Sequence, residues 1–350
     1  MPGTRIRSCS VRIFDTPLKR PFVTALGRKT ATCNVGFTLA LADGSRGYGE
    51  ASASLALAHL KPRHLARVLE RLGRQAQGAD AAGARSLIES AWQRHPGDGP
   101  AVSAFECALL AAWTRSRGLT LAEWFGGKLA TMDSDITLSA WTDPVLTEQA
   151  AAEAAAEGFR MFKVKVGGNP KQDLERMLTV WRAVRGSRPR FILDGNQGLS
   201  VASALRLTEA CMQAGMKIIL LEQPLPKTDF KGMAALTRRC PVPVAADEMV
   251  HSPADAVRVV EAGAASVLNI KVAKSGLLRA LDIAAVARAA GLRLMIGCMA
   301  ETAAGLWPSA ALALGTGCFS FVDLDSDHLL RGGPKSRSWT RQGPRLSLPD

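Results

Sequence analysis

From residue 135 onward the chain contains eight short apolar segments, and Ala-rich helical segments lie between them. The apolar segments begin about 24 to 29 residues apart, which is the length of one strand, loop and helix. Strands that alternate with helices run parallel, and eight such units close into a barrel. The strands are expected at 136–140, 161–166, 190–194, 217–222, 243–247, 267–272, 293–297 and 321–325. The pattern predicts an α/β fold, a TIM-type (β/α)7β barrel whose eighth strand leads into a turn-rich tail.

The N-terminal region has a different pattern. The segments SCSVRIFDTPL and VGFTLALADG, with a turn at GYGE, predict a small antiparallel sheet with hairpins. Helices are expected after it, near 62–76, 82–94 and 99–117. We therefore expect three parts: an α+β capping domain that carries substrate-specificity loops, a barrel that carries the chemistry, and a tail that packs back on the capping domain. Their predicted boundaries are 1–130, 131–328 and 329–350.

The charge, hydropathy and cysteine content argue against a nucleic-acid-binding, membrane-spanning or secreted protein. The formal net charge is +13, but Lys and Arg are spread along the chain among acidic residues, and only 5% of residues are aromatic, so we do not expect nucleic-acid binding. No segment has the roughly 18 apolar residues of a membrane span, and the N-terminal MPGTRIRSCSVRIF lacks the apolar core of a signal peptide. Seven cysteines without a CxxC pair indicate reduced thiols, and hence a cytoplasmic protein.

Three predicted strands that follow one another end in carboxylates. Asp194, Glu222 and Asp247 stand at or beside the carboxyl ends of strands three, four and five, where the active site of a TIM barrel lies. Clustered carboxylates repel one another unless a cation neutralises them. Oxygen ligands without His or Cys favour a hard ion, Mg²⁺ before Mn²⁺. The alternative is that each acid caps the helix that follows it.

Two lysines in FKVKVGG would place two positive charges close together on one strand. Lys163 and Lys165 are two residues apart on a strand, so both side chains point to one face. Lys271, on strand six, faces them across the barrel. A lysine beside a metal ion and another lysine is expected to have a lowered pKa and can act as a general base. Two bases on opposite faces of a carbanion suit a racemase or epimerase, with a metal stabilising the enediolate. The alternative is that these lysines reach solvent at the barrel rim.

The chain resembles the muconate-lactonizing subgroup of the enolase superfamily in a series of motifs: PFVTALG, FKVKVGG, LDGNQG, LLEQPLP, AADE, NIKVAKSG and IGCMAETAAG. The resemblance covers essentially the whole chain. It implies that Lys165 and Lys271 form the acid/base pair, that Lys163 assists electrostatically, and that the three acids bind Mg²⁺. The mandelate-racemase subgroup has a His–Asp base where Lys271 stands, and is therefore not expected. Barrels of this superfamily are often homo-oligomers.

The stretch FVDLDSDHLL discriminates within the subgroup. Asp323 and Asp325 share a face at the barrel mouth and can hold a cationic group by charge-assisted hydrogen bonds. Dipeptide epimerases of the subgroup look like this, with a DxD that receives the free α-ammonium of the substrate. The resemblance thus implies epimerisation at the C-terminal residue of a dipeptide by a two-base proton transfer. The alternatives are an N-acylamino-acid racemase, a muconate-type cycloisomerase or o-succinylbenzoate synthase, and a non-catalytic binding barrel.

The remaining candidates shape the pocket. In relatives that invert Ala-Glu, an Arg after the PF-x-T-A-L segment binds the glutamate; here Arg28 either takes that role or is a solvated arginine, which leaves an Ala-Glu-like or a hydrophobic dipeptide open. Asn196 and Glu248 are expected to support the metal ligands. Pocket-lining residues are expected to be Thr137, Cys298 and Met299, while a role for Glu301 as a proton donor is doubtful in an epimerase.

Overall fold

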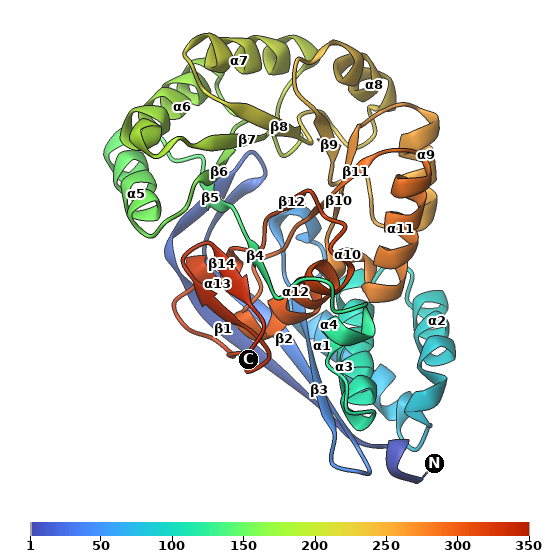
Figure 1. The fold of residues 1–350 in the computed structure, drawn as a ribbon. Helices are drawn as coiled ribbons and strands as arrows, with labels where there is room; N and C mark the ends of the chain where they lie inside the picture. Colours follow the sequence, from blue (N-terminus) through green and yellow to red (C-terminus); the bar gives the residue numbers. More distant parts are fainter. Residues whose placement is uncertain (1, 350) are drawn as a thin grey trace.

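A computed structural model describes residues 2–349 and contains three sheets (Figure 1). The first is antiparallel, in the order β1-β2-β3, and is followed by four helices. Its strands are β1 (Ile6–Thr24), β2 (Gly27–Leu41) and β3 (Arg46–Ser52), and the helices are α1 (Pro62–Ala76), α2 (Ala84–Arg94), α3 (Gly99–Ser116) and α4 (Leu121–Trp124). The predicted sheet is therefore present, with longer first and second strands than expected, and the three predicted helices have bounds that differ by at most two residues.

The GYGE stretch was expected to be a turn, and that prediction is wrong. Gly47 and Gly49 lie inside β3, and the turn precedes it, around Gly44 with φ of +92°. The glycines serve close packing instead. A Cβ on Gly47 would lie 1.8 Å from the carbonyl oxygen of Ala108, and one on Gly49 would lie 1.9 Å from that of Ala104. Helix α3 can therefore lie directly on this strand.

The second sheet is the predicted barrel. Its eight parallel strands follow the chain in order, and α5 to α9, α11 and α12 surround it (Figure 1). The strands are β5 (Ile136–Leu138), β6 (Met161–Lys165), β7 (Arg190–Asp194), β8 (Ile218–Glu222), β9 (Val244–Ala246), β10 (Val267–Ile270), β11 (Arg293–Ile296) and β12 (Phe321–Val322). The helices are α5 (Pro144–Ala156), α6 (Pro170–Val184), α7 (Val201–Gln213), α8 (Phe230–Arg239), α9 (Pro253–Glu261), α11 (Leu277–Ala289) and α12 (Ala303–Thr316), with the short α10 (Val272–Ser275) and α13 (Ser326–Leu329). The predicted fold class is confirmed.

The first and last barrel strands are joined by side chains as well as backbone. The Asp135 N–H donates to the Val322 carbonyl at 2.9 Å, and the Leu324 N–H donates to Ser134 Oγ at 2.9 Å. The Thr137 N–H donates to a carboxylate oxygen of Asp325 at 2.5 Å. The junction between β5 and β12 therefore positions one of the two DxD carboxylates.

An apolar cluster fills the barrel interior and is separate from the larger core outside the strands. It consists of Ile192, Leu220, Ala245, Val267, Met295 and Phe321, all with at most 6% of their surface exposed. In a parallel barrel such residues form packed layers rather than a pore. Polar side chains one layer further along the strands are therefore confined to the carboxyl-terminal mouth.

The C-terminal tail pairs with segments far away in sequence. Strands β13 (Thr340–Gln342) and β14 (Arg345–Ser347) form the third sheet with β4 (Thr131–Asp133), which leads into the barrel. The Arg331 N–H also donates to the Pro17 carbonyl in β1 at 2.8 Å. The tail thus contacts both the N-terminal region and the start of the barrel, and the division at residues 130 and 328 stays a prediction. Within residues 2–349 no helix is long and apolar enough to cross a membrane.

Candidate active site at the barrel mouth

Lys163 lies on the floor of the mouth, directly above the apolar barrel interior. Its neighbours in β6, Phe162 and Val164, face the outer core, so both lysines of FKVKVGG point inward as predicted. The Lys163 ammonium is surrounded by three carboxylates. Its Nζ lies 2.6 Å from Asp323 Oδ2, 2.8 Å from Glu222 Oε2 and 3.0 Å from Asp194 Oδ2. Burial lowers the pKa of Lys163, but Asp194 and the other acids outweigh burial and hold that pKa well above its usual value.

Lys165 is held by the strand next to its own. Its Nζ donates to Asp194 Oδ2 at 2.5 Å, and the two residues are register partners in β6 and β7. The ring of Phe22, from β1, lies 5.7 Å from the same ammonium. Unlike Lys163, Lys165 lines the cavity at the barrel mouth. It can therefore reach a bound small molecule.

The three predicted metal ligands converge beside these lysines. Asp194 and Glu222 end β7 and β8 as register partners, and Asp247 follows β9 by one residue. All three are at most 2% exposed. They do not cap the helices that follow, because those N-caps are Ser200, Asp229 and Ser252. The helix-capping interpretation is therefore wrong.

The acid set fits a divalent cation. Burial and the charge of Asp194 raise the pKa of Glu222 to about 8, which is the expected behaviour of a carboxylate held next to others without a cation. Glu222 Oε2 accepts no hydrogen bond and has only the ion contact with Lys163. The pKa of Asp194 is lowered to about 2, because Lys163 and Lys165 outweigh its burial. Three carboxylates, one with a buried oxygen that accepts no hydrogen bond, are suited to a hard ion.

Two lysines on the opposite side meet Asp247. Lys271 directly follows β10, and its Nζ lies 2.7 Å from Asp247 Oδ2. Lys274, three residues on in α10, donates to Asp247 Oδ1 at 2.6 Å. Lys274 was not among the predicted site residues, because it stands in a short helix after the strand end. Lys165 and Lys271 both line the cavity, so the prediction that they share one site agrees with the geometry.

The lowered lysine pKa expected beside a bound metal ion stays a prediction, because the charges that surround Lys163 and Lys271 here are carboxylates. Burial lowers the pKa of Lys271, but Asp247 outweighs burial and raises the pKa above its usual value. Burial lowers the pKa of Lys274 below its usual value, although Asp247 acts in the opposite direction. Carboxylate oxygens lie 2.6 to 3.0 Å from the Lys163 ammonium and 2.7 Å from the Lys271 ammonium, which explains the two raised pKa values.

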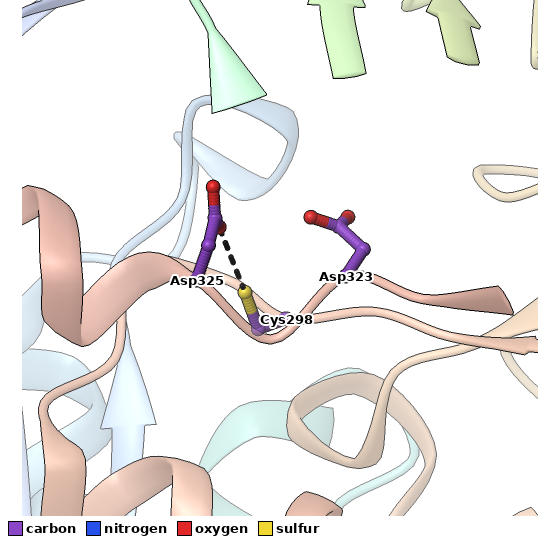
Figure 2. A group of neighbouring side chains, drawn as sticks. All are labelled: Cys298, Asp323 and Asp325. Carbon is purple, nitrogen blue, oxygen red and sulfur yellow. Dashed lines mark hydrogen bonds between the residues drawn. The ribbon is translucent and has the colours of Figure 1, made fainter. Parts of the chain in front are cut away.

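Asp323 and Asp325 form the third group of charges, and Figure 2 shows both carboxylates rising from one side of the segment after β12. Asp323 pairs with Lys163, whereas Asp325 accepts from the Thr137 N–H and lies 3.9 Å from Cys298 Sγ. Burial and the neighbouring charge of Asp323 raise the pKa of Asp325 to about 6. Both are buried and both line the cavity.

Asp135 is a further buried acid of the site, and it was not predicted from the sequence. Asp135 lies just before β5 and is fully buried. Burial, followed by the charges of Asp323 and Asp325, raises its pKa well above the usual range. The sequence did not indicate Asp135, because it stands before its strand, whereas site residues were sought at the carboxyl ends of the strands.

The N-terminal hairpin and the loop at 54–57 supply the outer wall of the cavity, and that wall is largely apolar. It includes Leu18, Phe22, Leu26, Leu55 and Leu57, together with Leu329 after the barrel. Thr137, Cys298 and Met299 line the cavity as predicted, and Asn196 and Glu248 line it as well. Glu301 is buried beside the cavity, accepts from the Met299 N–H at 3.0 Å and is not among the lining residues.

Arg28 is exposed and does not line the cavity, which argues against its predicted contact with substrate. Arg28 and Lys29 are consecutive in β2, so their side chains leave opposite faces of the hairpin. Lys29 is the one that lines the cavity, and its ammonium donates to the Ala53 carbonyl. Burial lowers the pKa of Lys29.

Comparison with known proteins adds a second line of observation. Residues 146–350 match the family model described as enolase C-terminal domain-like. The aromatic dipeptide epimerase of Herpetosiphon aurantiacus is 36% identical over 353 residues, which cover 100% of this chain and 98% of that protein. The L-Ala-D/L-Glu epimerase of Thermotoga maritima is 32% identical over 347 residues, covering 99% of each chain.

The solved structures include similar proteins with bound ligands. The dipeptide epimerase from Enterococcus faecalis V583, complexed with Mg and the dipeptide L-Leu-L-Tyr, aligns with a TM-score of 0.93 at 28% identity. The alignment covers 99% of this chain and 98% of that one. The similarity therefore extends through the barrel and the N-terminal region alike.

Proposed function

Because this chain belongs to the enolase C-terminal domain-like family, we propose that it is a Mg²⁺-dependent dipeptide epimerase. The observation that carries the proposal is that one cavity is lined by Lys165, Lys271 and the Asp323–Asp325 pair. Two lysines from different sides of the barrel suit proton transfer at a carbon atom. Two neighbouring carboxylates suit a substrate with a free ammonium group.

The DxD pair orients the substrate. Asp323 and Asp325 accept hydrogen bonds from the α-ammonium of the N-terminal residue, and the Thr137 N–H keeps Asp325 in place. This anchoring sets the α-carbon of the second residue between the lysines. A substrate whose amine is acylated has no charge to offer at this position, which disfavours the N-acylamino-acid racemase and cycloisomerase alternatives.

The lysines transfer the proton. One of Lys165 and Lys271, in its neutral form, removes the α-proton from its own face, and the other, as an ammonium, returns a proton from the far face. One proton leaves the α-carbon and one returns, so the inversion conserves atoms and charge. In the reverse reaction the lysine that donated the proton acts as the base, and the other lysine donates. Lys163, which lies on the floor beneath the cavity and pairs with Asp323, holds positive charge close to the reacting carboxylate.

Asp194, Glu222 and Asp247 would hold the Mg²⁺ ion, and Asn196 and Glu248 support them. The Asn196 N–H donates to Asp194 Oδ1 at 3.0 Å, and its side-chain amide donates to Glu248 Oε1 at 3.4 Å. When bound, Mg²⁺ supplies a positive charge that stabilises the substrate carboxylate as it gains negative charge.

The outer wall favours a hydrophobic dipeptide over an Ala-Glu-like one. Leu26, Leu55 and Leu57 offer apolar surface to the substrate side chains, while Arg28 is exposed outside the cavity. Lys29 is the cation that this hairpin presents to the cavity, and its hydrogen bond to Ala53 leaves it poorly placed to pair with a carboxylate. The aromatic dipeptide epimerase named above is a relative with a comparable preference in its name.

The proposal is tested with the purified chain and an L,L-dipeptide of hydrophobic residues. Chiral chromatography should detect the L,D-diastereomer only when Mg²⁺ is present, and chelation should stop the reaction reversibly. Calorimetric titration supplies a readout independent of activity: Mg²⁺ should bind the unchanged chain, and Asp247→Asn should weaken binding by at least about tenfold. Failure of Mg²⁺ to bind, or a diastereomer that never appears for any dipeptide, would contradict the proposal.

A further inference from the structure

We propose that helix α3, in the N-terminal region, positions Lys271 through two buried residues, Ser103 and Glu106. The inference rests on the proposed function, since it assigns them an effect on one of the two proton-transferring lysines. Neither residue lines the cavity, so both would act through the segment 271–278 that carries the lysine.

Lys271 and Lys165 are held in different ways. Lys165 lies within β6 and is paired in register with Asp194 of β7. Lys271 lies beyond the last paired residue of β10, at the start of the four-residue helix α10. A helix of this length is not stable alone. The backbone at Lys271 must therefore be fixed by something other than the barrel ladder.

Helix α3 supplies that support at both ends of the segment. Ser103 Oγ donates to the Val272 carbonyl at 2.6 Å, one residue after the lysine. Glu106 Oε1 accepts from the Leu278 N–H at 2.6 Å, where α11 begins, and the Trp92 indole N–H donates to Glu106 Oε2 at 3.1 Å. Ser103 is 1% exposed and Glu106 is 0% exposed, so water does not replace these bonds.

Close contacts leave the segment little freedom to shift. Gly276 has φ of +72°, and a Cβ there would lie 2.0 Å from Glu106 Oε2. On the other side, a Cβ on Gly99 at the start of α3 would lie 2.8 Å from the Lys274 carbonyl oxygen. Two glycines, one on each partner, thus allow the backbones to approach. The geometry of Lys271 depends on this contact, whereas the geometry of Lys165 does not.

Because α3 contacts the segment of Lys271 and not that of Lys165, weakening the contact should slow proton transfer on one face of the substrate only. In D₂O, each diastereomer of a dipeptide loses its α-proton to the lysine on its own face. Weakening the α3 contact should slow exchange for the diastereomer that meets Lys271 and spare the other. A general loss of stability would slow both equally. The face-specific effect therefore distinguishes positioning from a structural role.

The experiment measures deuterium uptake at the α-carbon of each diastereomer separately. Lys271→Met first identifies the diastereomer that depends on Lys271. Ser103→Ala should then slow exchange of that diastereomer by roughly tenfold or more, since small displacements of a catalytic group are costly, and change the other by less than about twofold. Ser103→Thr, which keeps the hydroxyl, should restore the rate.

Two further variants keep the test decisive. Thr114→Val removes a buried hydroxyl of the same helix that bonds only to the Ala111 carbonyl within α3, and it should leave both rates unchanged. Glu106→Gln places an amide NH₂ where a carboxylate oxygen accepted from the Trp92 N–H, and so loses that hydrogen bond. This variant weakens the α3 contact in a second way if Ser103→Ala does not fold. Equal slowing of both diastereomers, or slowing of neither, would overturn the inference alone. Absence of exchange in the unchanged protein would instead overturn the proposed function and the inference with it.

Discussion

Lys163 Nζ lies 2.6 Å from Asp323 Oδ2, so a lysine of the second barrel strand meets a carboxylate that follows the eighth, 160 residues later. Both groups are buried, and each would be costly to bury alone. The contact joins the side of the mouth that is proposed to hold the metal ion and the acid/base lysines to the side that is proposed to hold the substrate ammonium. Disturbing either residue should therefore affect substrate binding and proton transfer together.

Replacement of Asp323 by Asn tests the ammonium site. We expect kcat/KM for a free dipeptide to fall on the order of 100-fold or more, because a charge-assisted hydrogen bond is lost and Lys163 loses a carboxylate partner. The already poor turnover of an N-acetylated dipeptide should change far less. Asp282→Asn, at an exposed carboxylate of α11, is the matched control. An equal loss for both substrates would contradict the assignment.

Replacing Lys165 and replacing Lys271 should stop α-proton exchange of different diastereomers. Lys165→Met and Lys271→Met should each abolish epimerisation, by roughly a thousandfold, because inversion needs a proton donor opposite the base. Each variant should still exchange the α-proton of one diastereomer in D₂O without inverting it, and the surviving diastereomer should differ between the two. NMR of the α-proton signal follows this directly. If both variants spare the same diastereomer, the lysines do not lie on opposite faces.

The hairpin predicts a contrast between neighbouring residues. Arg28→Ala should change kcat/KM by less than about twofold for every dipeptide, because the side chain is exposed and outside the cavity. Lys29→Met should change the ranking of substrates, since Lys29 lines the cavity. A panel that pairs Ala-Glu with Leu-Tyr measures both effects, and hydrophobic dipeptides should be preferred. A strong loss of Ala-Glu turnover in Arg28→Ala would show that the hairpin moves on binding.

Glu106 should make stability depend on pH. Burial raises its pKa from 4.5 to about 7, so the folded chain keeps this proton over a range in which the unfolded chain has lost it. The free energy of unfolding should therefore fall as pH rises between about 4.5 and 7, by roughly 3 kcal/mol from this group. Glu106→Gln removes that contribution.

Denaturant unfolding at pH 5 and pH 8 measures the difference. The decline in stability should be smaller in Glu106→Gln than in the unchanged chain. Glu148→Gln, at an exposed position of α5, is the matched control and should retain the full decline. Identical declines in all three proteins would show that Glu106 does not hold a proton in the folded state.

Much of the fold could be predicted from the sequence because its signals are local. Each barrel strand is a short apolar run at a regular interval, and the side chains at the strand ends follow from the parallel topology. Asp194, Glu222 and the two lysines of FKVKVGG stand at or near such ends, and their convergence could be expected without coordinates.

The features that were missed depend on contacts between distant segments. The glycines of GYGE are explained by the backbone of α3, which is some 55 residues away in sequence. The difference between Arg28 and Lys29 is one of strand parity, and a shift of one residue exchanges the two faces. Lys274 and Asp135 stand outside the strand ends and carry no periodic signal. The raised pKa of Lys271 follows from a distance to Asp247 that no sequence pattern contains.

The most direct test of the account is the incubation of the purified chain with Mg²⁺ and a library of dipeptides in D₂O, followed by mass spectrometry. Each substrate should gain one mass unit, from a single deuteron at the inverted α-carbon, and hydrophobic dipeptides should do so fastest. N-acylated amino acids should stay unlabelled. If no dipeptide gains that mass unit, while the protein is folded and binds Mg²⁺, epimerisation of dipeptides is not its function.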